Sequence, residues 1–389
     1  MRSPVVRSGR RLGLILLLLT LVACARPRPT PPSQAGRGSG GPPAPPLAVT
    51  ATPGPAAPAP TPIVGLPAAD AYLAAQTAAG RFSGAVLVAR DGRVLLEKAY
   101  GLADRESGLP NTPQTRYHIA SLTKQFTAMA ILQLQERGRL RVADRIANYL
   151  PDCPATWRDI TIDELLTHTS GLADYFGLDG IDALLAHPVT PAQIVDLFRD
   201  RPLLFAPGSS CTYSNSGYVL LGEIIERVSG QSYADVIRQN ILAPLGMEST
   251  TYGPSCPPGA CAVGYETAWR RAPNVDLSLG YAAGGLCSTV EDLYRWDQAL
   301  YTTRLCSQQS LDAMFSPHFV VTENVAYGYG WVVRNLSGRR RIAHSGLLYG
   351  YSAIIARFPD QRVTIIMLSN LEDAPLTGYV DVLAGQVFQ

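Results

Sequence analysis

The sequence predicts an α/β (α+β) fold, in which one antiparallel sheet is built from both ends of the chain and an all-helical lobe is inserted between them. β-forming patterns occur in residues 82–100 and return in 329–369, whereas the segment between them is mainly helical, with Pro and Gly as separators. Terminal helices, at 68–79 and 377–388, are expected to flank the sheet. The boundary between two such lobes is a common place for a ligand-binding cleft.

The expected strands are recognised by β-branched residues and by turn signals. β-formers surround the dipeptide Asp91-Gly92, a strong signal for a two-residue hairpin turn. Near the C-terminus, a turn at residues 359–361 separates two further apolar runs. The strands expected in this second group are Tyr329–Val333, Arg340–His344, Gly350–Phe358 and Val363–Ser369.

The clearest helical pattern runs from Ser121 to about Arg137 and stops at Gly138. Its apolar residues cover more than one face, which predicts a helix buried inside the protein. The other helices expected in the inserted lobe are Ile162–His168, Pro191–Phe198, Tyr218–Ser229, Ser232–Ile241 and Thr289–Tyr301.

Residues 1–23 have the features of a lipoprotein signal peptide. Four arginines precede an apolar run from Leu12 to Val22, which is shorter than the roughly 20 residues that a spanning helix needs. The run ends in Leu21-Val22-Ala23-Cys24, which resembles the bacterial lipobox, whose cysteine is lipidated. A plain signal peptide and an uncleaved anchor are the alternatives. The lipobox interpretation predicts an extracytoplasmic protein anchored to the cell membrane through Cys24.

Residues 24–66 are expected to form a tether behind this lipidated cysteine. The stretch is dominated by Pro, Ala, Gly and Thr, and cannot bury enough apolar surface to order itself. Extended as polyproline II, it could reach on the order of 120 Å. Residues 67–389 are then the folded domain.

The charge distribution argues against a nucleic-acid partner. The whole chain has a formal net charge of +2, but residues 1–66 contain seven arginines and no Asp or Glu. The folded domain is therefore mildly acidic, whereas a nucleic-acid-binding domain presents a surface rich in Lys and Arg.

Six cysteines follow Cys24, and an even number in an oxidising compartment favours disulfides. Cys256 and Cys261 flank a Pro-Pro-Gly segment and could close a tight loop, but six cysteines allow 15 pairings. The five histidines are scattered, and the chain has no CxxC or HExxH motif, so no metal and no other cofactor are expected.

The main candidate for catalysis is Ser121-Leu122-Thr123-Lys124, at the start of the buried helix. Positions i and i+3 share a helix face, so the amine of Lys124 can reach the Ser121 hydroxyl. A serine hydroxyl is a weak nucleophile until a base takes its proton, and a lysine whose pKa is lowered by burial is such a base. Only two of the 33 Lys and Arg residues are lysines, Lys98 and Lys124, and arginine cannot replace lysine as a base.

A second candidate is Tyr213-Ser214-Asn215, in a loop before a helix. The Tyr213 phenol could ionise beside a lysine ammonium and act as a base, and the Asn215 carboxamide could hold a substrate amide. An ordinary turn is the alternative, because Asn and Ser favour turns.

A third candidate is His344-Ser345-Gly346, at the end of an expected strand. A strand edge can pair with an extended substrate, and Gly346 permits close approach. The N–H of Leu347 could join that of Ser121 in an oxyanion hole. A buried structural histidine is the alternative interpretation of His344.

In this order and at these separations, the S-x-x-K, Y-x-N and H-x-G motifs at residues 121, 213 and 344 resemble those of the penicillin-recognising serine hydrolases. The closest branch is the class C β-lactamase and D-alanyl-D-alanine carboxypeptidase group, with its related esterases and D-aminopeptidases. The similarity covers roughly residues 68–389, including the family-like segments 165–172, 280–286 and 327–331.

The resemblance implies a β-lactamase/transpeptidase-like fold and an acyl-enzyme on Ser121. It implies that Lys124 and Tyr213 share the proton transfers and that Asn215 orients the substrate. His344 stands where many β-lactamases have a lysine, as in some carboxypeptidases and D-peptidases, which argues against efficient β-lactam hydrolysis. The expected substrate is a D-amino acid peptide, a β-lactam or an ester. A binding or sensor module that holds a cell-wall peptide without turnover is the rival hypothesis.

His168 lies in one of the family-like segments, but it is not expected to be catalytic. Its expected role is to hold a loop by hydrogen bonds.

Overall fold

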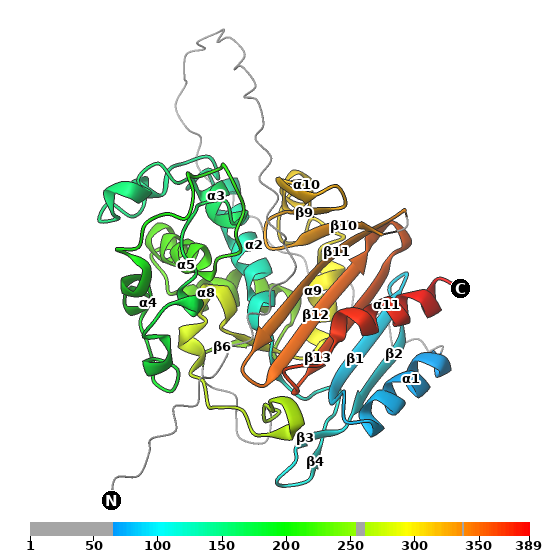
Figure 1. Ribbon diagram of the computed structural model, residues 1–389. Coiled ribbons are helices and arrows are strands. Elements are labelled where there is room, and N and C mark those ends of the chain that lie inside the picture. The colour runs from blue at the N-terminus through cyan, green and yellow to red at the C-terminus, as the bar shows by residue number, and fades with distance from the viewer. Residues whose placement is uncertain (1–64, 254–260, 337) are drawn as a thin grey trace, which may run out of the picture.

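The computed structural model describes residues 65–253, 261–336 and 338–389 (Figure 1). At its centre is an eight-stranded antiparallel sheet with the order β2-β1-β13-β12-β11-β10-β9-β8. Because β1 lies between β2 and β13, the two ends of the domain share one sheet, as the sequence predicts. The strands are β1 (Gly84–Arg90), β2 (Arg93–Tyr100), β8 (Phe319–Thr322), β9 (Val325–Tyr327), β10 (Val332–Leu336), β11 (Arg339–Leu348), β12 (Tyr351–Phe358) and β13 (Val363–Ser369).

Both faces of the sheet are covered, because the central strands alternate between two apolar cores. Leu87 of β1 belongs to the core shared with the helical lobe, whereas Val86 and Val88 belong to a core on the opposite face. This is the two-residue period of a β-strand. The second core is closed by the terminal helices α1 (Pro67–Ala78) and α11 (Leu376–Val387), and the first face is covered by α9 (Val290–Ala299) (Figure 1).

The turn between β1 and β2 forms at the predicted dipeptide. Asp91 and Gly92 both have positive φ, 52° and 75°, as a two-residue hairpin of the I′ type requires. The Asp-Gly signal therefore fixes the register of the first hairpin.

The helical lobe is built around α2 (Thr123–Glu136), in which every residue from Thr123 to Leu134 is buried. The prediction of a buried helix is confirmed, and its C-terminal end coincides with the expected stop before Gly138, where φ is 66°. The other helices of this part of the chain are α3 (Ile162–Leu166), α4 (Pro191–Phe198), α5 (Asn215–Ser229), α6 (Tyr233–Ile237), α7 (Ala243–Leu245), α8 (Tyr281–Gly284) and α10 (Gln308–Met314).

Several boundaries differ from the sequence-based expectation. Helix α5 begins at Asn215 instead of Tyr218, so Asn215 lies in the first turn of a helix. The helix expected at Ser232–Ile241 divides into α6 and a π-helical segment at Arg238–Leu242. Strand β8 at the sheet edge, its neighbour β9 and helix α10 were not expected, because each is short and only part of each is buried.

Four cysteines are free thiols, so the expectation that an even number would pair is wrong for them. Cys287, for example, lies in β7 (Leu286–Ser288), where its cross-strand neighbours are His118 and Thr251. Cys256 lies outside the described residues, and the loop closed by Cys256 and Cys261 stays a prediction. The free thiols are those of Cys153, Cys211, Cys287 and Cys306.

The predicted signal peptide, Cys24 and the tether as far as residue 64 lie outside the described residues. Of the helices in residues 65–253, 261–336 and 338–389, none is both long enough and apolar enough to cross a bilayer.

Candidate active site

Ser121 lies in a single 3-10 turn, Ala120–Leu122, that leads into α2. The residue before it, Ala120, has φ of 47°, in the left-handed region that a residue with a Cβ rarely adopts. Such strain concentrates at functional sites, where the surrounding structure enforces it. The turn brings Ser121 to the N-terminal end of α2, where free N–H groups and the positive end of the helix dipole favour negative charge.

Lys124 is fully buried one turn later, and its amine is surrounded by oxygen atoms. Nζ lies 3.2 Å from Oγ of Ser121, 2.7 Å from Oδ1 of Asn215 and 2.8 Å from the carbonyl oxygen of Ala283. Burial lowers the pKa of Lys124 to about 7, while the carboxylate of Asp174 acts in the opposite direction. A substantial fraction of this amine is therefore neutral at neutral pH.

Asp174 is a site residue that the sequence analysis missed. Its two carboxylate oxygens each accept from Nδ2 of Asn215 at 3.1 Å, and Oδ1 also accepts from the Asn215 backbone N–H at 3.0 Å. Burial raises the pKa of Asp174, and the hydrogen bonds from Asn215 oppose this. Asp174 thereby turns the amide oxygen of Asn215 toward Lys124. The available signal was its place two residues after the family-like segment 165–172.

Asn215 has protein partners for both ends of its amide. The oxygen accepts from Lys124 and the nitrogen donates to Asp174. Its expected role in holding substrate stays a prediction, and in the structure it links the lysine to the half-buried carboxylate of Asp174.

The ring of Tyr213 lies beside both members of the first motif. Nζ of Lys124 is 4.9 Å from the ring centroid. Burial raises the pKa of Tyr213 above its ordinary value, although a hydrogen bond with the Ser121 side chain acts against this. Tyr213 therefore stays protonated near neutral pH, and the expectation that its phenol ionises to act as a base is not supported. The reason is that burial outweighs the hydrogen bond with Ser121, and the charge of Asp174 raises the pKa of Tyr213 further.

His344 is buried, and its hydrogen bonds define its tautomer. Nδ1 lies 2.7 Å from the carbonyl oxygen of Ser345 and so carries the proton, while Nε2 accepts from the Tyr327 hydroxyl at 2.9 Å. Burial, followed by the charge of Lys124, lowers the pKa of His344 to about 3, despite the bond to Ser345. The ring is neutral at neutral pH and supplies no positive charge. Tyr327, the second missed residue, opens the family-like segment 327–331.

The strand that carries His344 lies directly against the Ser121 turn. Within β11, pairing with β10 ends at Ala343, so the edge from His344 to Leu348 is not covered by β10. A Cβ added to Gly346 would lie 2.3 Å from the carbonyl oxygen of Ile119, which leaves room for glycine alone. The side chain of Leu347 is 37% exposed at this edge.

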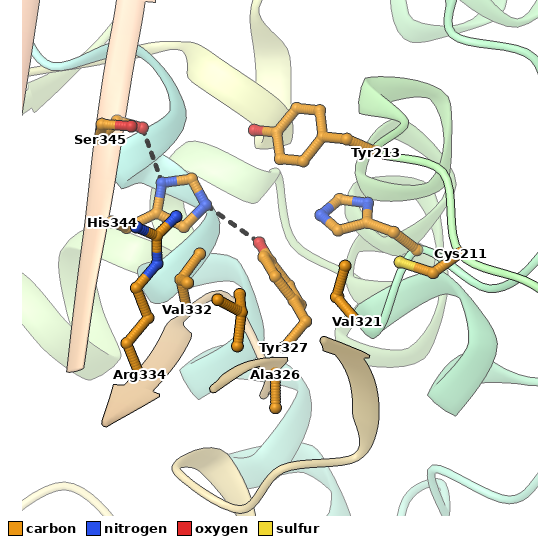
Figure 2. A pocket seen from close by; sticks show the side chains of 11 residues that line it. Cys211, Tyr213, Val321, Ala326, Tyr327, Val332, Arg334, His344 and Ser345 are labelled. Atoms are coloured by element: carbon orange, nitrogen blue, oxygen red, sulfur yellow. Dashed lines mark hydrogen bonds between the residues drawn. The ribbon is translucent and has the colours of Figure 1, made fainter. Parts of the chain in front are cut away.

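A narrow and mainly apolar pocket adjoins the site beyond Tyr213 and His344 (Figure 2). Figure 2 shows the rings of Tyr213 and Tyr327 on one side of it and His344 and Arg334 on the other. Arg334 is half-buried, and within the described part of the chain it forms no ion pair. It is the charged residue of the pocket, whose lining is His168, Cys211, Tyr213, Val321, Val325, Ala326, Tyr327, Val332, Arg334, His344 and Ser345.

His168 packs against this pocket and binds the loop that carries Tyr213. Its Nδ1 accepts from the N–H of Ser214 at 3.2 Å, and its carbonyl oxygen accepts from the N–H of Thr212 at 3.0 Å. These contacts confirm that His168 holds a loop by hydrogen bonds.

Of the residues described, no group of three His, Cys, Asp or Glu side chains lies close enough together to hold a metal ion.

The chain is similar to known proteins across this whole domain. The β-lactamase family profile matches residues 69–384. Penicillin-binding protein 4* of Bacillus subtilis (strain 168) is 37% identical over 316 residues, which cover 75% of this chain and 69% of that protein. The crystal structure of a penicillin binding protein from Bacillus halodurans has a TM-score of 0.72 and 28% identity, covering 81% of this chain and 98% of that one. D-amino acid amidase from Ochrobactrum anthropi SV3 also has a TM-score of 0.72, with 26% identity over 82% of this chain and 97% of that one.

Proposed function

Because the chain belongs to the β-lactamase family of penicillin-recognising serine hydrolases, we propose that Ser121 is the nucleophile with which it performs acyl transfer. Ser121 Oγ attacks the carbonyl carbon of an amide, β-lactam or ester bond, and the leaving group departs with a proton. Water then cleaves the acyl-enzyme and releases the acid.

The observation that carries this proposal is the environment of Lys124. In the neutral amine, the two N–H groups can donate to Asn215 and Ala283, which leaves the lone pair facing Oγ of Ser121 at 3.2 Å. The amine can then accept the hydroxyl proton as the bond to the carbonyl carbon forms. The pKa of about 7, caused mainly by burial, places this base in the useful range near neutral pH.

Tyr213 is suited to pass a proton to the leaving group. It stays protonated, and it lies beside both Ser121 and the lysine amine. The phenol can donate its proton to the departing atom and recover one from the Lys124 ammonium, so the proton balance closes within the site.

The N-terminal end of α2 and the open edge of β11 are suited to hold the substrate. We assign the oxyanion hole to the N–H groups of Ser121 and Leu347, because Gly346 lets β11 approach the Ser121 turn. The uncovered edge from His344 to Leu348 can pair with an extended acyl chain as an added strand.

The substrate class follows from the charge of the neighbouring pocket. His344 is neutral, and Arg334 is the cation among the pocket residues. The positive charge of Arg334 favours a leaving group that carries a carboxylate, so a D-amino acid peptide is favoured over an ester. His344 supplies no charge where many β-lactamases have a lysine, so β-lactam hydrolysis is expected to be slow. The solved neighbour that is a D-amino acid amidase supports a D-configured substrate.

The proposal places the enzyme outside the cytoplasm, with Cys24 lipidated after removal of residues 1–23 and the Pro-rich segment acting as a tether. The folded domain then works in the space beside the membrane.

Acyl-enzyme trapping tests the proposal. Wild-type protein incubated with fluorescent penicillin and quenched in acid is expected to carry label on Ser121, and Ser121→Ala is expected to carry none. Turnover is measured on a D-Ala-D-Ala peptide, its C-terminal amide, nitrocefin and short-chain nitrophenyl esters. We expect the free carboxylate to be preferred over the amide. Label that persists without turnover supports a sensor module, and a wild type without label or hydrolysis contradicts the enzyme assignment.

A further inference from the structure

One residue binds the backbone on both sides of Tyr213. The carbonyl oxygen of His168 accepts from the N–H of Thr212 at 3.0 Å, and its ring Nδ1 accepts from the N–H of Ser214 at 3.2 Å. Two hydrogen bonds from a single residue, one from its main chain and one from its side chain, therefore bracket the phenol. Since Tyr213 comes from a segment without regular structure, this bracket is a principal constraint on its backbone.

The ring of His168 is itself held in one orientation by aromatic neighbours. Its centroid lies 4.3 Å from that of Tyr213, 4.6 Å from that of Tyr327 and 5.3 Å from that of Tyr218. Only 2% of the residue is exposed. The imidazole therefore has little freedom to rotate, and its face supports the ring of Tyr213 directly.

The backbone of His168 is strained. Its φ is 61°, in the left-handed region, where Asn, Asp and His are the commonest residues after glycine. This conformation turns the carbonyl toward Thr212 while the side chain of the same residue reaches Ser214. Strain of this kind is retained where it produces a specific geometry.

The hydrogen-bonding state of the ring distinguishes this histidine from one that only fills space. Because Nδ1 accepts, the proton lies on Nε2, and that buried Nε2 has no hydrogen-bond partner among the described residues. An unpaired buried N–H is unfavourable, so an apolar side chain would pack here at lower cost. What histidine adds at this position is the acceptor at Nδ1.

We infer that His168 is a positioning residue that sets the phenol of Tyr213 against Ser121 by bracketing Thr212 and Ser214. The inference rests on the proposed function, because it assigns His168 to the proton transfer that Tyr213 carries out. It predicts that loss of the Nδ1 acceptor slows acylation without weakening substrate binding, since the hydrogen bond that is lost goes to the Ser214 backbone.

Two amide substitutions form a matched pair for the test. In His168→Asn, Oδ1 occupies the position of Nδ1, and Asn tolerates positive φ. In His168→Gln, the oxygen lies one bond further out and cannot replace Nδ1. We expect His168→Asn to keep kcat within about fivefold of wild type, and His168→Gln to lose about tenfold to a hundredfold in kcat with KM unchanged, as small misplacements of reacting groups do. Thermal unfolding of both variants establishes that they fold.

A double-mutant cycle with Tyr213→Phe separates positioning from a general structural effect. The rate of Ser121 acylation by fluorescent penicillin is measured in the single and double variants. If His168 acts through the phenol, His168→Gln slows the wild type but leaves the slow Tyr213→Phe enzyme unchanged.

Equal kcat values for the Asn and Gln variants, or a full additional loss in the Tyr213→Phe background, would overturn the inference. Normal acylation by His168→Gln beside slow acylation by Tyr213→Phe also refutes it, while leaving the proposed function intact. Failure of the proposed function itself would appear differently, as a wild type that does not acylate Ser121.

Discussion

Two groups of residues meet at Ser121. One surrounds ionisable groups with hydrogen-bond partners, whereas the other consists of rings that burial keeps neutral. In the lysine group (Lys124, Asn215 and Asp174), each amine or amide hydrogen meets an oxygen, and the carboxylate of Asp174 partly offsets the burial of the amine. In the aromatic group (His168, Tyr213, Tyr327 and His344), burial lowers the pKa of both histidines and raises the pKa of both tyrosines, so all four rings are neutral.

The two groups therefore differ in their ability to accept a proton from Ser121. The lysine group contains a base whose pKa lies near 7, whereas the aromatic group contains none in the physiological range. The aromatic group can orient rings and donate hydrogen bonds. Substitutions in the two groups should therefore differ in their effects on catalysis.

The largest effect is expected at the base itself. Lys124→Arg keeps a positive charge but cannot accept a proton, so we expect it to be nearly as inactive as Lys124→Ala, with kcat at least about 10³-fold below wild type. Steady-state hydrolysis of an activated ester measures this. An arginine variant that retains more than about a tenth of wild-type kcat contradicts a base at this position. Lys98→Arg, at an exposed ion pair with Asp70, is the matched control and should be unaffected.

A large effect is also expected where β11 approaches the Ser121 turn. In Gly346→Ala the new methyl group meets the carbonyl oxygen of Ile119 at 2.3 Å, so the strand must move away from the nucleophile. We expect acylation to slow about a hundredfold and the free energy of unfolding to fall by about 1–3 kcal/mol. Gly378→Ala is the control, because a Cβ there meets nothing within 4 Å. Normal acylation by Gly346→Ala would show that acylation does not need the close approach of β11 to the Ser121 turn.

Removal of the Asp174 carboxylate should change the pH profile more than the maximal rate. The Asp174 charge raises the pKa of Lys124, so Asp174→Asn should lower that pKa further. Activity requires the neutral amine and therefore rises with pH through the lysine pKa. The acid limb of kcat/KM, near pH 7 in the wild type, should move to lower pH, with kcat reduced about tenfold because Asn215 loses its orienting partner. An acid limb that stays near pH 7, or moves to higher pH, argues against an effect of Asp174 on the pKa of Lys124. Asp179→Asn, at an exposed position, is the control.

The smallest effect is expected at the hydrogen bond between Tyr327 and His344. Tyr327→Phe removes the hydroxyl that donates to Nε2 of His344 at 2.9 Å and leaves that nitrogen without a donor. We expect kcat to fall only about threefold and the free energy of unfolding by about 1–3 kcal/mol, because no proton transfer uses this bond. Tyr294→Phe, whose buried hydroxyl has no hydrogen-bond partner within the described residues, should change neither quantity. A loss of kcat comparable to that of Lys124→Ala would show that the proton transfers depend on the bond between Tyr327 and His344.

Much of the fold is predictable from local patterns. The sequence has strong periodicity and turn signals for three features, and the structure contains all of them. They are the Asp91-Gly92 turn, the buried helix that follows Ser121 and the last two strands. Strands β8 and β9 are too short for a two-residue period to be visible, although each pairs with a strand that is its neighbour in sequence.

Only those site residues that belong to recognisable sequence motifs could be predicted. Ser121 and Lys124 are recognisable because residues three positions apart on a helix share a face. Asp174 and the hydroxyl of Tyr327 are not, because their roles depend on which side chain packs beside them after folding. The protonation of Tyr213 could not be judged from the sequence either, since it depends on how completely the ring is buried.

The most direct test of the neutral lysine is its own titration. The chain contains two lysines, so protein labelled with ¹³C at the lysine ε-carbon gives two side-chain resonances, and Lys98→Arg assigns the one from Lys124. We expect the Lys124 resonance to titrate near pH 7, in step with the acid limb of acylation. A Lys124 resonance that shows a fully charged amine up to pH 9 would contradict a general base at this position.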